Sequence, residues 1–152
     1  MHKNIVKVVG VFVIGCLFLT GCGNKKSITS ETFQKQMEKK QYTVQDVTAA
    51  YDEETTSKAL IAVNTDFQVE FYTLKNDKGA NSSYDFNKSR VAIQKIKGAK
   101  EKEEKKANYI RYTLETSKVY TVISKIDKTV LYVSTDIKYK KDVDAILKDL
   151  NY

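Results

Sequence analysis

Residues 109–150, YIRYTLETSKVYTVISKIDKTVLYVSTDIKYKKDVDAILKDL, carry the most regular patterns of the chain. Three segments rich in β-branched and aromatic side chains predict strands: residues 109–114, 118–126 and 129–135. A helix is predicted at residues 139–150, where apolar side chains spaced i, i+3, i+4 and i+7 form one stripe: Val143, Ile146, Leu147 and Leu150. This part of the chain therefore predicts a sheet followed by a helix with one buried face.

A β-hairpin is predicted further upstream. Residues 58–63 and 67–74 form its two strands, and the polar residues 64–66 connect them. The second strand alternates apolar and polar side chains, which is the period of a strand with one apolar face; its apolar set is Phe67, Val69 and Phe71. Residues 42–44 alternate in the same way and predict a further short strand.

A first helix is predicted at residues 29–40. Thr29 is a suitable N-cap residue, and Glu31 favours the positively polarised N-terminal end of a helix. Phe33 and Met37 stand four residues apart and so share one side. We therefore expect an amphipathic helix that buries these two side chains.

Two segments between the hairpin and the later strands have weaker patterns. Residues 80–96 carry apolar side chains at intervals of four, which favours a helix, although residues 91–93 would also fit a strand. Residues 97–106 are mostly charged, and we expect an exposed loop or a frayed helix end there. Together the predicted elements give an α+β fold: an antiparallel sheet of about five or six strands with two or three helices packed mainly on one face.

The N-terminus has the pattern of a secretion signal. A short basic region is followed by the apolar run 8–19 and then by Leu19-Thr20-Gly21-Cys22. This motif resembles the lipobox of bacterial lipoproteins, and the resemblance implies cleavage between Gly21 and Cys22 and a diacylglyceryl thioether on Cys22. Residues 13–16 also fit the pattern, with Cys16 as the lipid site, but the apolar run before them is shorter and another apolar stretch follows.

The predicted processing divides the chain into three parts. Residues 1–21 would be the cleaved signal peptide, residues 22–28 a lipidated tether, and residues 29–152 a single α+β domain. The apolar run is shorter than the roughly 20 residues that a membrane-spanning helix needs. We therefore expect a protein anchored by lipid to the outer, extracytoplasmic face of the cell membrane.

The rest of the chain resembles the small lipoproteins of unknown function that are common in low-GC Gram-positive bacteria. The resemblance is one of pattern, and it implies no activity. The residues that carry it are Phe33 in the first helix, residues 67–72 in the hairpin, and Val130, Leu131 and Tyr132 before the last helix.

The residue types that remain after processing restrict the chemistry. His2 is the only histidine of the chain and leaves with the leader, and Cys22 would be acylated. Catalysis by Ser-His-Asp or Cys-His, and zinc or copper sites built on histidine or cysteine, are then excluded. We expect no enzyme activity, no metal and no cofactor, although a small hydrolase acting through carboxylates stays as a third hypothesis.

One constellation has a pattern suited to binding. Tyrosines alternate with cations along the predicted strands, and such a surface can hold a polyanion or a sugar; the candidate ligand face is Tyr109, Arg111, Tyr112, Tyr120 and Tyr132. Strand tyrosines also pack into cores, so a structural role is the other interpretation. The formal charge of +7, which becomes +5 without Lys3 and Lys7, has two interpretations: solubility, because acidic residues and lysines are interspersed, or attraction to anionic lipids or wall polymers.

Three functions are therefore weighed. The first is a non-catalytic binding or interaction module at the cell envelope, whose partners would be the membrane, anionic envelope polymers or another envelope protein. The second is a small ligand-binding lipoprotein that serves a transporter or a sensor. The third is the carboxylate hydrolase. Nucleic acid is not an expected partner of an exported, anchored domain.

Overall fold

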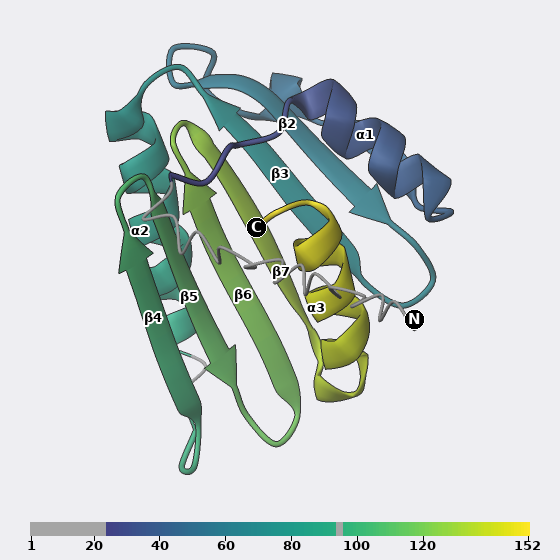
Figure 1. Cartoon of the computed structure of the whole chain (residues 1–152), viewed down its shortest axis with the longest axis vertical. Coiled ribbons are helices and arrows are strands. Elements are labelled where there is room, and N and C mark those ends of the chain that lie inside the picture. Colours follow the sequence, from purple (N-terminus) through teal and green to yellow (C-terminus); the bar gives the residue numbers. More distant parts are fainter. Residues whose placement is uncertain (1–23, 94–95) are drawn as a thin grey trace, which may run out of the picture.

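The computed structural model describes residues 24–93 and 96–152 (Figure 1). The predicted signal peptide and its two candidate lipid sites, Cys16 and Cys22, lie outside these ranges. Within the ranges, three α-helices pack on one antiparallel sheet, so the predicted α+β class is confirmed.

Seven strands of the described chain form the sheet, in the order β1-β2-β3-β7-β6-β5-β4. All neighbouring strands are antiparallel. The bounds are β1 (Thr43–Asp46), β2 (Thr56–Val63), β3 (Gln68–Leu74), β4 (Lys100–Lys106), β5 (Tyr109–Glu115), β6 (Val119–Ile126) and β7 (Thr129–Asp136). The predicted hairpin is β2–β3, and the three strands predicted near the end of the chain are β5, β6 and β7.

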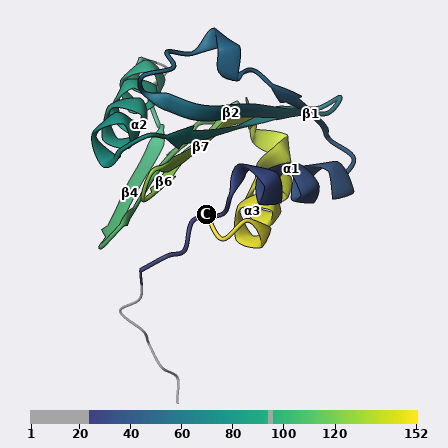
Figure 2. The ribbon, with the colours of Figure 1, turned by 90° about the horizontal axis from the view of Figure 1, so that it is seen from above.

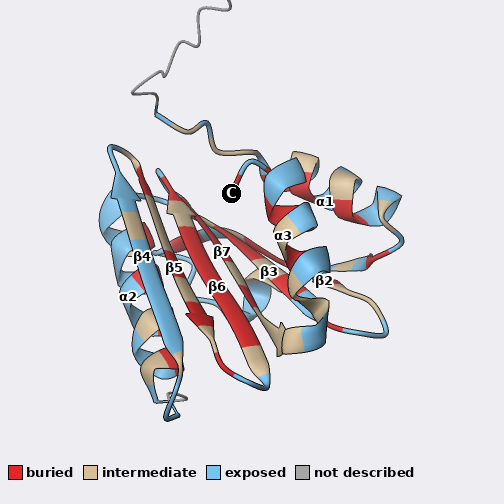
Figure 3. Ribbon diagram, turned by 60° about the horizontal axis from the view of Figure 1, so that its bottom comes forward, coloured by how far each residue is buried: buried red, intermediate tan, exposed pale blue. Residues whose placement is uncertain are grey.

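The seventh strand corrects a prediction. The charged run that predicted a loop or a frayed helix end is the edge strand β4, with the sequence KEKEEKK. It pairs only with β5, and six of its seven side chains are exposed (Figure 3). Charged side chains are tolerated on an edge strand, and they oppose the addition of a further strand. No hydrophobic alternation announces such a strand, which is why the pattern missed it.

The helices lie on both faces of the sheet. Helices α1 (Ser30–Lys39) and α3 (Lys140–Asp149) cover one face, and α2 (Asp77–Ala92) covers the other (Figure 2). The prediction that the helices lie mainly on one face therefore holds for two of the three. Central strands buried on both faces require this arrangement: β6, for example, has five consecutive buried residues rather than an alternation.

Each face of the sheet has its own apolar core. Below α1 and α3, the ring of Phe33 stacks on Phe71 with the centroids 4.8 Å apart. Below α2, Ala80, Tyr84 and Val91 pack on a second cluster of strand side chains. These three positions confirm the helical interpretation of the ambiguous segment, although the helix begins earlier and ends earlier than the pattern predicted.

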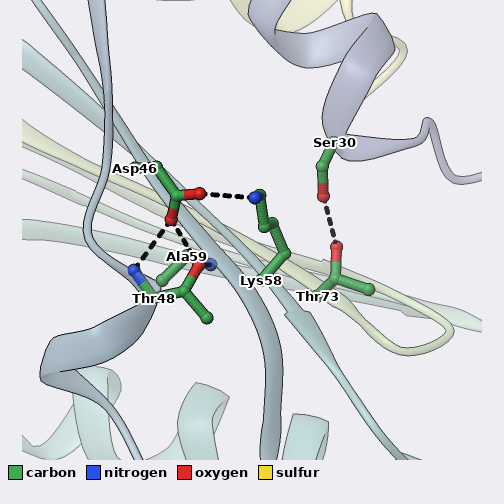
Figure 4. Close-up of polar contacts among 6 residues, drawn as sticks. All are labelled: Ser30, Asp46, Thr48, Lys58, Ala59 and Thr73. Atoms are coloured by element: carbon green, nitrogen blue, oxygen red, sulfur yellow. Dashed lines mark hydrogen bonds and ion pairs between the residues drawn. The ribbon is translucent and has the colours of Figure 1, made fainter.

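Polar contacts fix the outer elements to the sheet (Figure 4). Thr29 caps α1 as predicted, accepting a hydrogen bond from the backbone N–H of Thr32 at 3.2 Å. Ser30, at the first turn, lies 3.0 Å from the hydroxyl of Thr73 in β3. Near the β1 edge of the sheet, the hydroxyl of Thr48 accepts a hydrogen bond from the backbone N–H of Ala59 at 3.0 Å.

The carboxylate of Asp46 contacts both Thr48 and Lys58 at the β1 edge of the sheet. It accepts from the backbone N–H of Thr48 at 3.0 Å and forms an ion pair with Lys58 (Figure 4). The hydrogen bond from Lys58, followed by those from Thr48, holds the pKa of the Asp46 carboxyl well below its ordinary value. Helix η1 (Thr48–Ala50) is thereby tied to β2.

The helices leave part of the sheet open. On the face of α1 and α3, α1 lies over the β1–β3 side and α3 over the middle, whereas β4 and β5 have no helix above them in the described chain (Figures 1 and 3). Asn151 adopts a positive φ of 64° after α3, so the chain folds back and the backbone N–H of Tyr152 donates to Leu147 at 2.8 Å. The open strands and the end of α3 form the walls of a groove.

Candidate anion-binding groove

The groove lies between α3 and the open strands β4 and β5, and we call it the α3 groove. It consists of two hollows, of about 330 Å³ and about 360 Å³, that share Arg111. Its basic lining is Lys25, Lys100, Lys102, Arg111, Lys140 and Lys148. Its acidic lining is Glu101, Glu104, Glu115 and Asp144. Cations are therefore in excess along the groove.

The strand period and one helix stripe place these side chains. In β5, Tyr109 belongs to the core below α3 and Tyr112 to the core below α2. Arg111, two residues from Tyr109, therefore faces α3. Lys140, Asp144 and Lys148 follow at intervals of four along α3, which places them on one side of the helix, where they line the groove.

Arg111 stands at the centre of the groove with an unsatisfied donor. Its Nε atom is buried and has no hydrogen-bond partner among the described residues. The nearest carboxylate oxygen, Oδ1 of Asp144, lies 3.9 Å from Nη2 of Arg111, which is beyond hydrogen-bonding distance. Buried donors are nearly always paired in native proteins, so this guanidinium is suited to an acceptor from outside the chain.

Asp144 is already engaged by two other donors. Its carboxylate accepts from the hydroxyl of Tyr120 at 2.7 Å and from Nζ of Lys140 at 2.7 Å. Burial and the hydrogen bond to Asp144 raise the pKa of Tyr120 to about 12, so this hydroxyl stays protonated and donates at neutral pH. The Asp144 carboxylate is therefore hydrogen-bonded by Tyr120 and Lys140, and it meets Arg111 only at the longer ion-pair distance of 3.9 Å.

A second cation comes from the N-terminal segment. Nζ of Lys25 lies 4.1 Å from the centroid of the Tyr109 ring and donates to the carbonyl of Asn151 at 3.3 Å. Burial lowers the pKa of Lys25, and the neighbouring charge of Arg111 lowers it further. Two like charges held close together repel one another, and an anion between them would relieve the repulsion.

The structure divides the predicted ligand face. Tyr109, Arg111 and Tyr120 lie on the side of α3, whereas Tyr112 and Tyr132 lie on the side of α2. Three of these tyrosines are buried, with at most 4% of each residue exposed: Tyr109, Tyr112 and Tyr120. The tyrosines therefore contribute mainly to the two cores, and Arg111 with the edge of Tyr120 is what reaches the groove.

Sequence reasoning missed the groove residues that come from elsewhere in the chain. Lys25 enters because the N-terminal segment packs on the domain, and no local pattern indicates that contact. Lys140, Asp144 and Lys148 do have a signal, since their spacing of four residues places them on one helix side, next to the apolar stripe.

A separate hollow, of about 520 Å³, lies beside α2 on the opposite face of the sheet from the α3 groove. Tyr51 and Phe86 line it and are exposed by 40% and 61%. The Tyr51 ring meets Tyr72 edge-on, with the centroids 5.3 Å apart. This hollow is more apolar than the α3 groove, and its size suits a small molecule.

Known proteins add no assignment to these two sites. Comparisons of the chain with protein-family models, with curated proteins and with solved structures found no match. Within residues 24–93 and 96–152, no three His, Cys, Asp or Glu side chains are grouped so that they could hold a metal ion. In the same ranges, no helix has the length and apolar character needed to span a bilayer.

Proposed function

We propose that this protein is a lipid-anchored, extracytoplasmic binding module whose α3 groove holds an anionic group of its partner. The observation that carries the proposal is the buried Nε of Arg111, which has no hydrogen-bond partner among the described residues. A second cation, the half-buried Lys25, lines the same hollow. The lipobox resemblance around Cys22 supports the anchor and the location.

The chemistry of the groove favours binding over catalysis. A general base needs an accessible, unengaged acceptor, but Asp144 accepts from Tyr120 and Lys140. An activated tyrosine nucleophile would need a lowered pKa, whereas burial raises that of Tyr120. The engaged Asp144 carboxylate, together with the Nε donor of Arg111 that no described residue accepts, favours the binding of an anion.

Phosphate and carboxylate are the anionic groups that fit best. A guanidinium offers a planar set of donors that matches two oxygens of either group, and an adjacent ammonium adds a point charge. Such groups occur on anionic envelope polymers, on membrane lipids and on acidic protein segments. The proposed partner therefore belongs to the cell envelope.

The anion site is tested by thermal unfolding of the purified protein with inorganic phosphate. A ligand at 100 times its Kd stabilises the folded state by about 2.7 kcal/mol, which raises the Tm by several degrees. We expect this rise in the wild type and its loss in Arg111→Gln. Arg90→Gln is the matched control, because Arg90 is the only other arginine of the chain and lies in the last turn of α2, on the opposite face of the sheet. Equal responses of the two variants would contradict the site.

The anchor is tested separately by incorporation of a labelled fatty acid in the producing cells. We expect Cys22→Ser to lose the label and Cys16→Ser to keep it. The reverse result would move the lipid site to Cys16. If neither the wild type nor the variants incorporate the label, the proposed anchor is contradicted.

A small-ligand receptor is a second candidate function, favoured by the 520 Å³ hollow beside α2. Its exposed aromatic lining would bury the apolar part of a small molecule. A thermal-shift screen of small apolar ligands tests this candidate, with Phe86→Ser as the variant that should lose the response. A screen without any stabilising compound would count against it.

A further inference from the structure

The N-terminal segment is bound to the domain rather than extended away from it. Asn108, in the turn between β4 and β5, accepts from the backbone N–H of Lys25 at 3.1 Å and donates to its carbonyl at 2.8 Å. Asn151, after α3, donates to the carbonyl of Lys26 at 3.2 Å. Ile28 packs against the core below α1 and α3. The chain is therefore fixed to the mouth of the α3 groove from Lys25 onward.

This attachment sets how far the groove can be from a lipid on Cys22. Lys25 is the third residue after Cys22. At 3.3–3.6 Å per residue, three residue steps span at most about 11 Å. Because Nζ of Lys25 itself lines the groove, a membrane that holds Cys22 must lie within roughly this distance of the groove mouth.

We propose that the α3 groove binds the phosphate of an anionic phospholipid headgroup in the same membrane that holds the Cys22 anchor. The face of α1 and α3 then lies against the bilayer, and α2 points away from it. The inference rests on the proposed lipid anchor. It deepens the proposed binding function by naming the ligand class and the orientation of the domain.

The distribution of charge supports a headgroup as the occupant. Lys25, Arg111 and Lys148 surround the hollow at the end of α3, with Asp144 as its acidic side chain. Lys26 is exposed beside them. Cations close to an anionic membrane surface are attracted to it. Asp144 does not reverse this attraction, because Lys140 and Tyr120 engage its carboxylate.

Proximity favours a lipid over a polymer. The anchor holds the groove beside headgroups of its own leaflet, so their effective concentration is far higher than that of a free anion in solution. The described chain begins on the side of α1 and α3, away from α2 (Figure 2). The hollow beside α2 then faces outward, where an envelope partner or a small ligand could reach it.

The test measures which face of the anchored protein meets the headgroups. The full processed protein is reconstituted in vesicles of phosphatidylglycerol or of phosphatidylcholine that contain a headgroup-located quencher. A fluorescent label is placed on Ala145→Cys, an exposed position of α3, or on the matched Ser82→Cys, an exposed position of α2. Neither position contributes a side chain to the α3 groove.

We expect the label at position 145 to be quenched at least twofold more than the label at position 82 in phosphatidylglycerol vesicles. The difference should fall in phosphatidylcholine and on adding Arg111→Gln to the labelled protein. It should persist in millimolar inorganic phosphate, which would compete only weakly with tethered headgroups. Lys148→Gln, which removes an exposed cation of the groove lining, is a second variant in which the difference should also fall.

Equal quenching at the two positions would overturn the inference. So would a difference in quenching that stays the same in phosphatidylcholine vesicles and in the Arg111→Gln variant. If phosphate still stabilises the protein through Arg111 in that case, the groove binds a free anion or a polymer and the proposed function stands. The mass of the N-terminal peptide is measured on the same preparation. If that mass shows no acyl group, the anchor itself has failed, which separates the two results.

Discussion

Replacing Tyr152 with Ala should cost more stability than its position near the end of α3 would suggest. The side chain is 2% exposed, and its ring meets Phe71 edge-on with the centroids 6.0 Å apart. Truncation of a buried aromatic residue costs about 3–5 kcal/mol, and the aromatic pair adds about 0.5–1.5 kcal/mol to the contact itself. We expect a loss of about 4 kcal/mol for Tyr152→Ala.

Tyr152→Phe separates packing from hydrogen bonding at this position. The Tyr152 hydroxyl is hydrogen-bonded to that of Thr129, which also donates to the carbonyl of Ile126 at 2.7 Å. Because Thr129 keeps a partner in the variant, we expect a loss of only about 1 kcal/mol.

Urea unfolding measures both losses, and an unchanged m value would show that the variants alter stability alone. Tyr51→Ala is the control, because the Tyr51 side chain is 40% exposed and should lose much less. A loss below about 1 kcal/mol for Tyr152→Ala would refute the packing of the chain end below α3, and with it one wall of the groove.

Two further predictions concern the outer elements. Thr29→Ala removes the cap of α1 and should lower the free energy of unfolding by about 1 kcal/mol in urea, whereas a cost near zero would contradict the cap. Since the pKa of Asp46 is lowered in the folded state, its contribution to stability is complete above its ordinary pKa of about 4 and is lost as the pH falls further. Asp46→Asn should therefore flatten the acid side of the stability profile in thermal unfolding, and an unchanged profile would contradict the contact with Lys58.

Local patterns sufficed for the elements that have an apolar period. The Thr29 cap, the hairpin and the stripe of Val143 and Leu147 all carry their signal within one element, and the structure confirms each of them. The strand β4 carries no such signal, because pairing with β5 rather than burial stabilises it. The position of α2 depends on strands buried on both faces, and the expectation of helices mainly on one face did not indicate which helix would lie on the other.

The candidate site was only partly accessible to sequence reasoning. Tyr109 and Tyr112 are three residues apart, and an odd spacing along a strand places side chains on opposite faces, so their separation follows from the strand period. The pairing of Tyr132 with Ile123 of β6 depends on register and could not be known in advance. The approach of Lys25 to Arg111 depends on contacts between distant parts of the chain, through Asn108.

The most direct test of the central claim is to observe the Nε–H resonance of Arg111 by NMR during a titration of the protein with inorganic phosphate. Arg90, on the other side of the sheet, provides an internal reference in the same spectrum. We predict a saturable shift of the Arg111 signal with little change at Arg90. In Lys25→Gln, this shift should be weaker or absent. Parallel, non-saturating shifts of both arginines would mean that phosphate acts only through ionic strength, and would contradict an anion site in the α3 groove.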